Sequence, residues 1–309
     1  MHKEDVFMKM AVIGGAGLLG STSAFMAGLK GYLEEIKLID IKENLVKNHV
    51  LDMGQAVYPS GTKISYGDYS DLADCGIILL TASMPERQVA DRMEYLWDNM
   101  KLIKPICEKI KANCPGAVLI NATNPVDIFN YIIWKLLGWD RSKILGFNGN
   151  DTYRLKWAVS KVTGKDFKDI DGFCIGEHGN GTVNLYDKMT CGGEKLDLTD
   201  DQIAQIETIT KNFFIEFQSL NSGRTSGWCS AVNIEELIEA VATDSGKVLE
   251  CSSVLLGEYG FDNVSFGVPV SVGSDGIKSY EMPSLTEEQR RRLEDITGAM
   301  KKTIEAIEL

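Results

Sequence analysis

The sequence predicts an α/β protein that begins with a doubly wound parallel sheet and continues with an α+β domain. From Met8 to about residue 147, short aliphatic runs alternate with helical patterns, as is typical of a parallel sheet with crossover helices. The chain has 309 residues, more than the roughly 250 to 300 that one hydrophobic core usually supports. We therefore expect two lobes that share an interface, with domains at 1–148 and 149–309.

Five aliphatic runs are expected to be the strands of the first domain. They cover residues 10–13, 36–40, 77–81, 118–121 and 144–147. The spacing between neighbouring runs leaves room for a helix, which a parallel connection requires. After residue 150 long helical patterns dominate, interrupted by strand-rich segments at 173–175 and 183–185. Near the end, Thr286 and Gln289 form a capping-box pattern that starts a helix with apolar residues from Leu293 to Ile307, expected to close the second lobe.

Composition excludes several classes of function. A net charge of −12 argues against nucleic acid, because phosphate binding needs clustered Lys and Arg. The start of the chain is acidic and lacks the apolar stretch of a signal peptide, and the apolar runs are too short for a bilayer span. We therefore expect a cytoplasmic protein with no membrane contact. The seven cysteines contain no C-x-x-C pair, so neither a metal site nor a disulfide framework is expected.

A glycine-rich turn follows the first expected strand. Gly15, Gly17 and Gly20 form a G-x-G-x-x-G pattern before a helical run. Such a turn lets backbone N–H groups reach a pyrophosphate at the start of a helix, where the helix dipole is positive. The placement predicts a Rossmann dinucleotide site that also includes Leu18 and Leu19.

Asp40 ends the second expected strand, 20 residues after Gly20. A carboxylate at this place can accept hydrogen bonds from both ribose hydroxyls of adenosine. Its alternative role is that of a turn residue or helix N-cap. Because its charge would repel a 2′-phosphate and Ile41 offers no guanidinium, NAD is predicted rather than NADP.

Only three histidines occur, at positions 2, 49 and 178. His178 lies in a glycine-flanked loop that should expose its imidazole, whereas His49 falls in a helical stretch and is expected to be structural. Asp151, 27 residues before His178, could orient that imidazole and raise its pKa. Arg154 would share a helix face with Asp151 and could bind a carboxylate. These groups suit hydride transfer to and from a small 2-oxo or 2-hydroxy acid.

Several motifs occur in one order along the chain. They are the glycine turn, Asp40, residues 121–127 (NATNPVD), Asp151-x-x-Arg154, residues 176–179 (GEHG), residues 223–225 (GRT) and residues 267–270 (GVPV). In this order and at nearly this spacing, they resemble the lactate/malate dehydrogenase family over essentially the whole chain.

The resemblance implies a role for each matching residue. It implies that His178 is the proton donor, Asp151 its partner and Arg154 the ligand of the substrate carboxylate. Asn124 would bind substrate and hold the nicotinamide region, and Arg92 would polarise the carbonyl from a mobile loop. Further cofactor positions are expected at Thr81, Ala82, Ser83 and Asn99, and a further substrate position at Thr225. The resemblance also implies a homodimer or homotetramer.

The sequence departs from the family pattern at four places. The loop at 81–92 lacks a Pro-Gly pair and carries Ser83 in place of a glycine. Glu86 stands where malate dehydrogenases place a second substrate-binding arginine. One residue is missing between Gly146 and Asp151, and Asn180 replaces the usual aspartate after His-Gly.

Glu86 leaves the substrate open. Two carboxylates about 4 Å apart repel by roughly 4 kcal/mol at an effective dielectric near 20, so a Glu86 that faces the pocket would disfavour oxaloacetate. In a different loop register Glu86 would face solvent, and Arg87 or Arg224 would complete an ordinary malate or lactate pocket. A third possibility is an apolar pocket, because the segment from Asp91 to residue 96 (DRMEYL) is similar to the loop of L-2-hydroxyisocaproate dehydrogenases. The small Cys229 would leave room for it.

Two other classes of protein were weighed against an active dehydrogenase. A catalytically silent NAD-binding protein would be expected to have lost His178, Asp151 or Arg92, and all three are present. An NAD-dependent glycosidase would be expected to carry a metal-binding Cys and His pattern, which the sequence lacks. The enzyme is therefore favoured.

Overall fold

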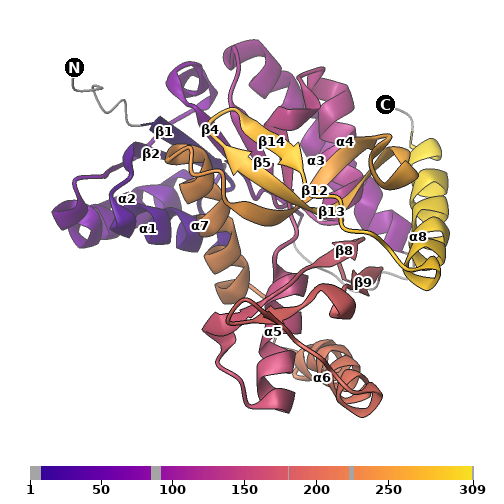
Figure 1. Ribbon diagram of the computed structural model, residues 1–309. Coiled ribbons are helices and arrows are strands. Elements are labelled where there is room, and N and C mark those ends of the chain that lie inside the picture. The colour runs from indigo at the N-terminus through magenta and orange to yellow at the C-terminus, as the bar shows by residue number, and fades with distance from the viewer. Residues whose placement is uncertain (1–7, 85–91, 180, 223–225, 308–309) are drawn as a thin grey trace, which may run out of the picture.

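The parallel sheet of the first half has the strand order β3-β2-β1-β4-β5-β6 (Figure 1). The computed structural model describes residues 8–84, 92–179, 181–222 and 226–307, without the side chains of residues 92–95, 214 and 218. The strands are β1 (Met8–Ile13), β2 (Leu33–Ile39), β3 (Lys63–Tyr66), β4 (Ile77–Leu80), β5 (Val118–Asn121) and β6 (Ile144–Phe147). This order is that of the doubly wound dinucleotide fold, so the predicted α/β class is confirmed. Strand β3, which has four residues and only one buried side chain, was not predicted.

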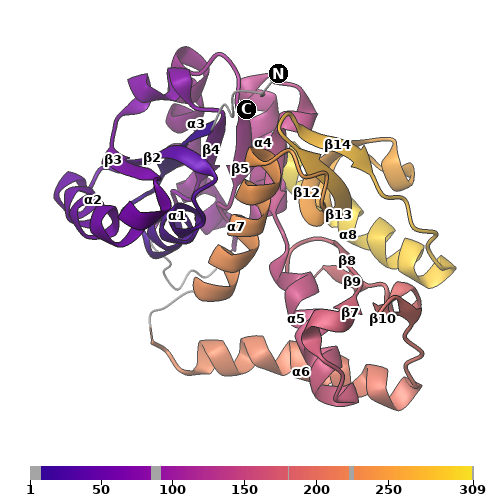
Figure 2. The same cartoon turned by 60° about the vertical axis from the view of Figure 1, so that its left-hand side comes forward.

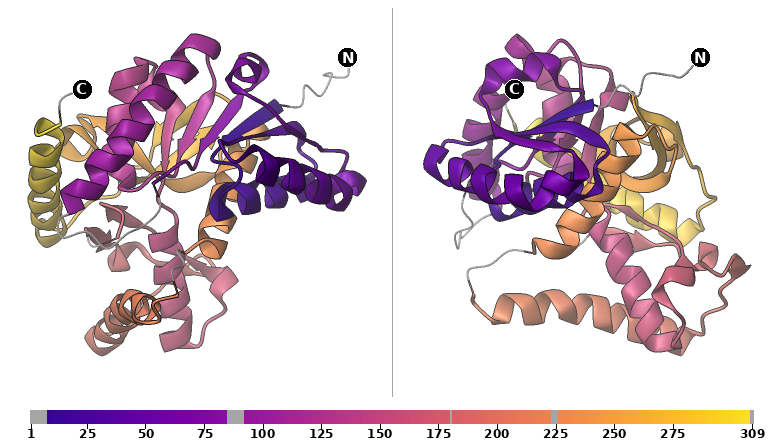
Figure 3. Two further views of the ribbon diagram at one scale, coloured as in Figure 1. Left: turned by 180° about the vertical axis from the view of Figure 1, so that it is seen from behind. Right: turned by 90° about the vertical axis from the view of Figure 1, so that its left-hand side faces the viewer.

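Helices cover both faces of this sheet (Figure 3). They are α1 (Leu18–Lys30), α2 (Glu43–Val57), α3 (Arg92–Asn113), α4 (Val126–Leu137) and, from the second half, α7 (Trp228–Ala242). Side chains of β1 alternate between two cores: Met10 and Val12 pack with α1 and α7, whereas Ala11 and Ile13 pack with α3 and α4. Because both faces are buried, the central strands read as continuous apolar runs, which made them easy to predict.

A smaller lobe hangs below the sheet (Figure 2). It contains the helices α5 (Asn150–Thr163) and α6 (Asp200–Ser219) and a three-stranded sheet of β7 (Ile170–Asp171), β10 (Thr190–Cys191) and β11 (Glu194–Lys195). Residues such as Leu155, Met189 and Ile206 form a separate hydrophobic core there. The strands expected near 173–175 and 183–185 are β8 (Cys174–Gly176) and β9 (Thr182–Asn184).

The main sheet continues across the chain's midpoint into the second half. The long antiparallel strands β12 (Val248–Leu256) and β13 (Asp262–Gly273) follow β6 in the sheet, and β14 (Gly276–Tyr280) pairs with β13. No long strands were predicted in this part of the sequence. The reason is that buried Glu250, Ser252 and Ser253 interrupt the apolar run of β12, so its pattern does not look like a core strand.

The C-terminal helix α8 (Glu287–Glu305) begins with the predicted capping box, since Thr286 accepts from the Gln289 N–H and Gln289 accepts from the Thr286 N–H. It does not simply close the second lobe. It packs against α4, β9 and β13, and Ile307 joins the core formed by α3 and α4. In the described ranges, no helix is long and apolar enough to cross a membrane.

Candidate active site

The glycine turn lies where β1, β2 and β4 end. The N–H groups of Gly14 and Gly15 both donate to the Ile39 carbonyl, at 2.9 and 3.1 Å. Gly14 has φ +94°, and a Cβ there would lie 2.7 Å from both the Ala82 nitrogen and the Thr81 Oγ1. The backbone therefore approaches the end of β4 more closely than any other residue allows. Gly14 precedes the recognised motif and was not predicted as part of the site.

Helix α1 starts immediately after this turn. Its N-cap is Gly17, and within the described residues no side chain caps it. A Cβ on Gly20 would lie 2.5 Å from the Gly14 carbonyl oxygen, so the helix is packed tightly onto the turn. Bare N–H groups and the positive end of a helix dipole suit a pyrophosphate. Leu18, next to Leu19 at the helix start, lies against Gly227 at the N-cap of α7.

Asp40 directly follows β2 and is fixed beside the glycine turn. Its Oδ2 accepts from the Ala16 N–H at 3.1 Å and its Oδ1 from the Lys42 N–H at 3.0 Å. The carboxylate thus serves as a turn residue. It also lies beside the glycine turn and the first residues of α1, which together we call the dinucleotide cradle. Ile41 beside it is 95% exposed and brings no positive charge.

The ends of β4 and β5 are joined by side-chain hydrogen bonds. Thr123 Oγ1 donates to the Ala82 carbonyl at 2.8 Å. Asn99, which is completely buried, accepts from the Met84 N–H at 2.8 Å and donates to the Asn124 carbonyl at 3.3 Å. These contacts place Asn99 beneath the two loops as a brace, whereas Ser83 and Asn124 are exposed at the surface.

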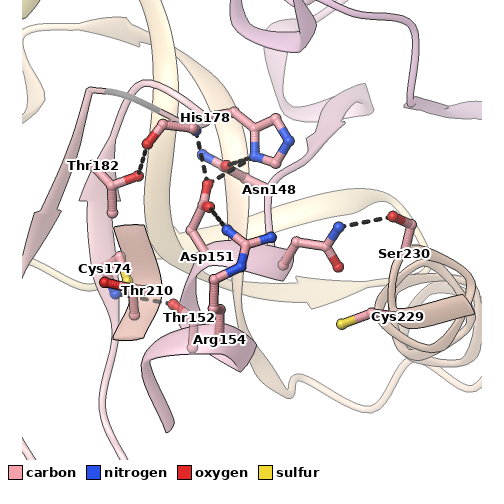
Figure 4. Close-up of polar contacts among 12 residues, drawn as sticks. Asn148, Asp151, Thr152, Arg154, Cys174, His178, Thr182, Thr210, Cys229 and Ser230 are labelled. Atoms are coloured by element: carbon pink, nitrogen blue, oxygen red, sulfur yellow. Dashed lines mark hydrogen bonds and ion pairs between the residues drawn. The ribbon is translucent and has the colours of Figure 1, made fainter. Parts of the chain in front are cut away.

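The structure brings His178 and Asp151 together (Figure 4). Asp151 lies in the first turn of α5, and its Oδ2 is 2.8 Å from the His178 Nδ1. The imidazole side chain is only 17% exposed, so the loop covers it more than its flanking glycines led us to expect. The His178 N–H donates to the buried Asp127 carboxylate at 2.7 Å, which anchors the loop to α4.

Asp151 is surrounded by donors. Besides His178, it accepts from the Gly179 N–H at 3.0 Å and from the Arg154 Nη1 at 2.9 Å. Burial alone would raise the pKa of Asp151, but the charge and hydrogen bond of His178, together with Arg154 and the Gly179 N–H, hold that pKa below its usual value. Asp151 is therefore an anion at neutral pH.

The contact between Asp151 and His178 also shifts the pKa of the imidazole, but in the opposite direction. Burial would lower the pKa of His178, but the Asp151 charge, the hydrogen bond to it and the Asp127 charge outweigh burial and raise that pKa above its ordinary value. With Nδ1 directed at Asp151, Nε2 is the nitrogen that can exchange a proton with a substrate.

Arg154 lies on the other side of the shared carboxylate, one helical turn after Asp151 as predicted. Its guanidinium lies over the Phe213 ring of α6, 4.9 Å from the ring centroid. Such stacking fixes the plane of a guanidinium, whose fork of N–H donors has the geometry that suits a carboxylate. Nothing in the sequence pointed to Phe213, because the contact joins two helices far apart in the chain.

Helix α7 faces this group in Figure 4. Ser230 accepts from the Asn150 amide at 2.7 Å, and Asn233 donates to the Asn150 amide oxygen at 3.2 Å. The Cys229 thiol is partly buried there, and burial raises its pKa. The thiol is therefore neutral at physiological pH.

Several predicted site residues lie outside the described part of the chain. They are Glu86, Arg87, Asn180, Arg224, Thr225 and the side chain of Arg92, whose backbone begins α3.

A dinucleotide cradle on one lobe and an imidazole, a carboxylate and a guanidinium on the other are the parts of a nicotinamide-dependent dehydrogenase of small acids. Comparisons with known proteins agree. Residues 8–146 match the family model of the lactate/malate dehydrogenase NAD binding domain, and residues 150–308 match that of the lactate/malate dehydrogenase alpha/beta C-terminal domain. The chain belongs to the lactate/malate dehydrogenase family and binds NAD.

Individual relatives include both kinds of enzyme. The chain is 28% identical to an L-lactate dehydrogenase of Acetivibrio thermocellus over 100% of both chains. It is 32% identical to a malate dehydrogenase of Bacillus mycoides, over 95% of this chain and 97% of that one. The crystal structure of a Cryptosporidium parvum lactate dehydrogenase with lactic acid and NAD superposes with a TM-score of 0.90, at 26% identity, over 98% of this chain and 99% of that one.

The Gly14 turn yields a test of the cradle. Gly14→Ala should weaken NADH binding about tenfold or more, because the new methyl group would push Thr81 and Ala82 away from the turn. Gly61→Ala is the matched control: its φ of +85° is equally unusual, but a methyl group there meets nothing within 4 Å. Fluorescence titration with NADH measures both, and equal affinities for the two variants would contradict the close-approach argument.

Proposed function

We propose that this family member is an L-2-hydroxyacid dehydrogenase in which His178 exchanges the proton at the substrate's C2 oxygen. The observation that carries the proposal is the Asp151 carboxylate, which contacts His178 with one oxygen and Arg154 with the other. A proton donor and a cation are thereby held at the two ends of one carboxylate. A 2-oxo acid presents a carbonyl oxygen and a carboxylate at a similarly short separation.

Each residue then has one task. Arg154 binds the substrate carboxylate, for which its planar fork of N–H donors is suited. His178 Nε2 donates a proton to the carbonyl oxygen during reduction and accepts it from the hydroxyl during oxidation. Asp151 stabilises the imidazolium and orients the ring. Bound NAD(H) supplies the redox chemistry at C2, while Asn124 and Arg92 are proposed to hold and polarise the substrate.

The substrate's side chain is the finer question. Relatives of similar identity are named as lactate and as malate dehydrogenases. We propose that Glu86 lines the pocket and disfavours a second carboxylate, so that the preferred 2-oxo acid carries a neutral hydrogen-bond donor or a cationic side chain. The competing proposal is an ordinary malate or lactate enzyme completed by Arg87 or Arg224. That the chain is a cytoplasmic homodimer or homotetramer stays a prediction.

A panel of 2-oxo acids tests the proposal directly. Pyruvate, oxaloacetate and acids with larger side chains would be compared by the loss of NADH absorbance. Turnover of any member supports the dehydrogenase. If the folded protein binds NADH and reduces none of them, a catalytically silent NAD-binding protein becomes the better conclusion.

The cofactor preference tests Asp40. We expect kcat/KM with NADH to exceed that with NADPH about tenfold or more, because the Asp40 carboxylate would face the extra phosphate. Asp40→Ser should narrow this difference in kcat/KM. Glu34→Ser, which removes an exposed acid from strand β2, should not. Equal use of both cofactors by the wild type would show that Asp40 is not at the ribose.

Removing the imidazole tests the proton transfer. His178→Ala should lower kcat about a hundredfold or more and leave NADH binding intact, because the cofactor is held by the other lobe. In the wild type, kcat/KM for reduction should be constant at low pH and fall as pH rises through the raised pKa of His178, above about 6.5. Oxidation should show the reverse.

Asp151→Asn supplies the matched change in that profile. Without the carboxylate charge the pKa of His178 falls, so the decline of the reduction rate should move to lower pH. Retention of more than about a tenth of kcat by His178→Ala would remove His178 from the acid/base role.

Glu86→Arg separates the two substrate proposals. It should raise activity on oxaloacetate about tenfold or more, with a smaller gain on pyruvate, since an attraction replaces a repulsion that solvent partly screens. Arg154→Lys should lower the activity on all 2-oxo acids alike, because it removes the bidentate hydrogen bonds to the substrate carboxylate. If the wild type already uses oxaloacetate efficiently and Glu86→Arg changes nothing, Glu86 does not line the pocket and malate is the leading substrate.

A further inference from the structure

The His178 imidazole has a second neighbour besides Asp151. Asn148 lies on the turn between β6 and α5 and is completely buried. Its Oδ1 is 3.0 Å from the His178 Nδ1, and its Nδ2 donates to the Gly176 carbonyl at 3.3 Å. Figure 4 shows the amide beside the imidazole, on the same edge of the ring as Asp151.

The fold leaves a specific place for this amide. Gly267 on β13 pairs with Gly176 on β8. A Cβ on Gly267 would lie 1.8 Å from the Asn148 Nδ2, so any side chain at 267 would force the amide to move. The Asn148 side chain therefore occupies the volume that a side chain at 267 would need. Its position is fixed by three segments of the chain: the β6–α5 turn, β8 and β13.

The surroundings also decide which way the amide points. Because the Gly176 carbonyl can only accept, the NH2 group of Asn148 must face it, and the amide oxygen then faces the imidazole. In the reversed orientation, two donors would meet at His178 Nδ1 and two acceptors at Gly176. The Nδ1–H of His178 thus has two acceptors, Asp151 Oδ2 at 2.8 Å and Asn148 Oδ1 at 3.0 Å.

We propose that Asn148 is a positioning residue that holds His178 with its hydrogen on Nδ1 and its Nε2 toward the substrate. The proposal rests on the proposed role of His178 in proton transfer. Asn148 reaches the ring from the β6–α5 turn and Asp151 reaches it from the first turn of α5. Two acceptors on separate segments fix the tilt of the imidazole better than one acceptor would. A neutral oxygen does this without the repulsion that a second carboxylate beside Asp151 would add.

The charged groups around the ring are known, so the effect of the amide can be isolated. Asp151 and Arg154 face the ring from α5, and Asp127 contacts its backbone from α4. Burial raises the pKa of Asp127 to about 7. Glu250 on β12 lies behind, near Gly267, and burial raises its pKa well above the usual value. Replacing Asn148 changes none of these groups, but it removes an oxygen dipole that favours the imidazolium.

The test uses the three histidines of the chain. With ¹⁵N-labelled histidine, NMR titration reports the pKa and the tautomer of His178, and the spectrum of His178→Gln identifies its signals. Asn148→Leu removes the amide at similar size. It should lower the pKa of His178 by about half a unit to one unit, admit the other tautomer, and shift the pH profile of reduction by the same amount while NADH binding is unchanged.

Gly267→Ala is a second route to the same result, because it keeps the amide but displaces it. It should lower the pKa of His178 in the same direction and decides the question if Asn148→Leu does not fold. Gly116→Ala is its control, since a methyl group there meets nothing within 4 Å.

An unchanged pKa and tautomer of His178 in folded Asn148→Leu would overturn the proposal, even if turnover fell. The NMR readout needs no substrate. Failure of the proposed function, seen as full activity of His178→Ala, is therefore distinguishable from failure of the Asn148 contact.

Discussion

The buried Asp151 carboxylate is the interaction on which the site depends. A charge only 5% exposed is stable in a folded protein only when donors surround it. Asp151 has three from the chain itself: the His178 ring, the Gly179 N–H and the Arg154 guanidinium. The carboxylate in turn holds each of these donors in place. Asp151 therefore sets both the positions and the charges of the groups around it. Losing any donor would leave the anion undersatisfied and would loosen the others.

The sheet explains why these donors meet. Strand β6 leads directly through Asn148 into α5, and β12 and β13 extend the sheet on its other side, so the turn that carries Asp151 is fixed by both halves of the chain. The His178 loop follows β8, which pairs with β13. The dinucleotide cradle is formed by the ends of β1, β2 and β4 in the same sheet. The glycine turn, the Asp151 segment and the His178 loop are thus all held by one continuous sheet.

What the sequence could reveal depended on the range of each interaction. The central strands were predicted because burial on both faces leaves an uninterrupted apolar run, and the α8 capping box because it is local. The pairing of His178 with Asp151 was inferred from the chemistry of the residue types. The stacking of Arg154 on Phe213 and the Asn148 contact were not found, because they join distant segments with no local pattern. Strand β12 was missed because its buried Glu250 and serines look like surface residues.

The close approach of Gly267 to Asn148 has a consequence for how this sequence can vary. The two residues are far apart in the chain, yet they share one volume, so neither can change size independently of the other. Substitutions at the two positions should be strongly non-additive, as for residues in direct contact. A side chain at 267 fits without displacing its neighbour only when the residue at 148 is smaller, so in descendants of this chain the two sites are expected to covary as a pair.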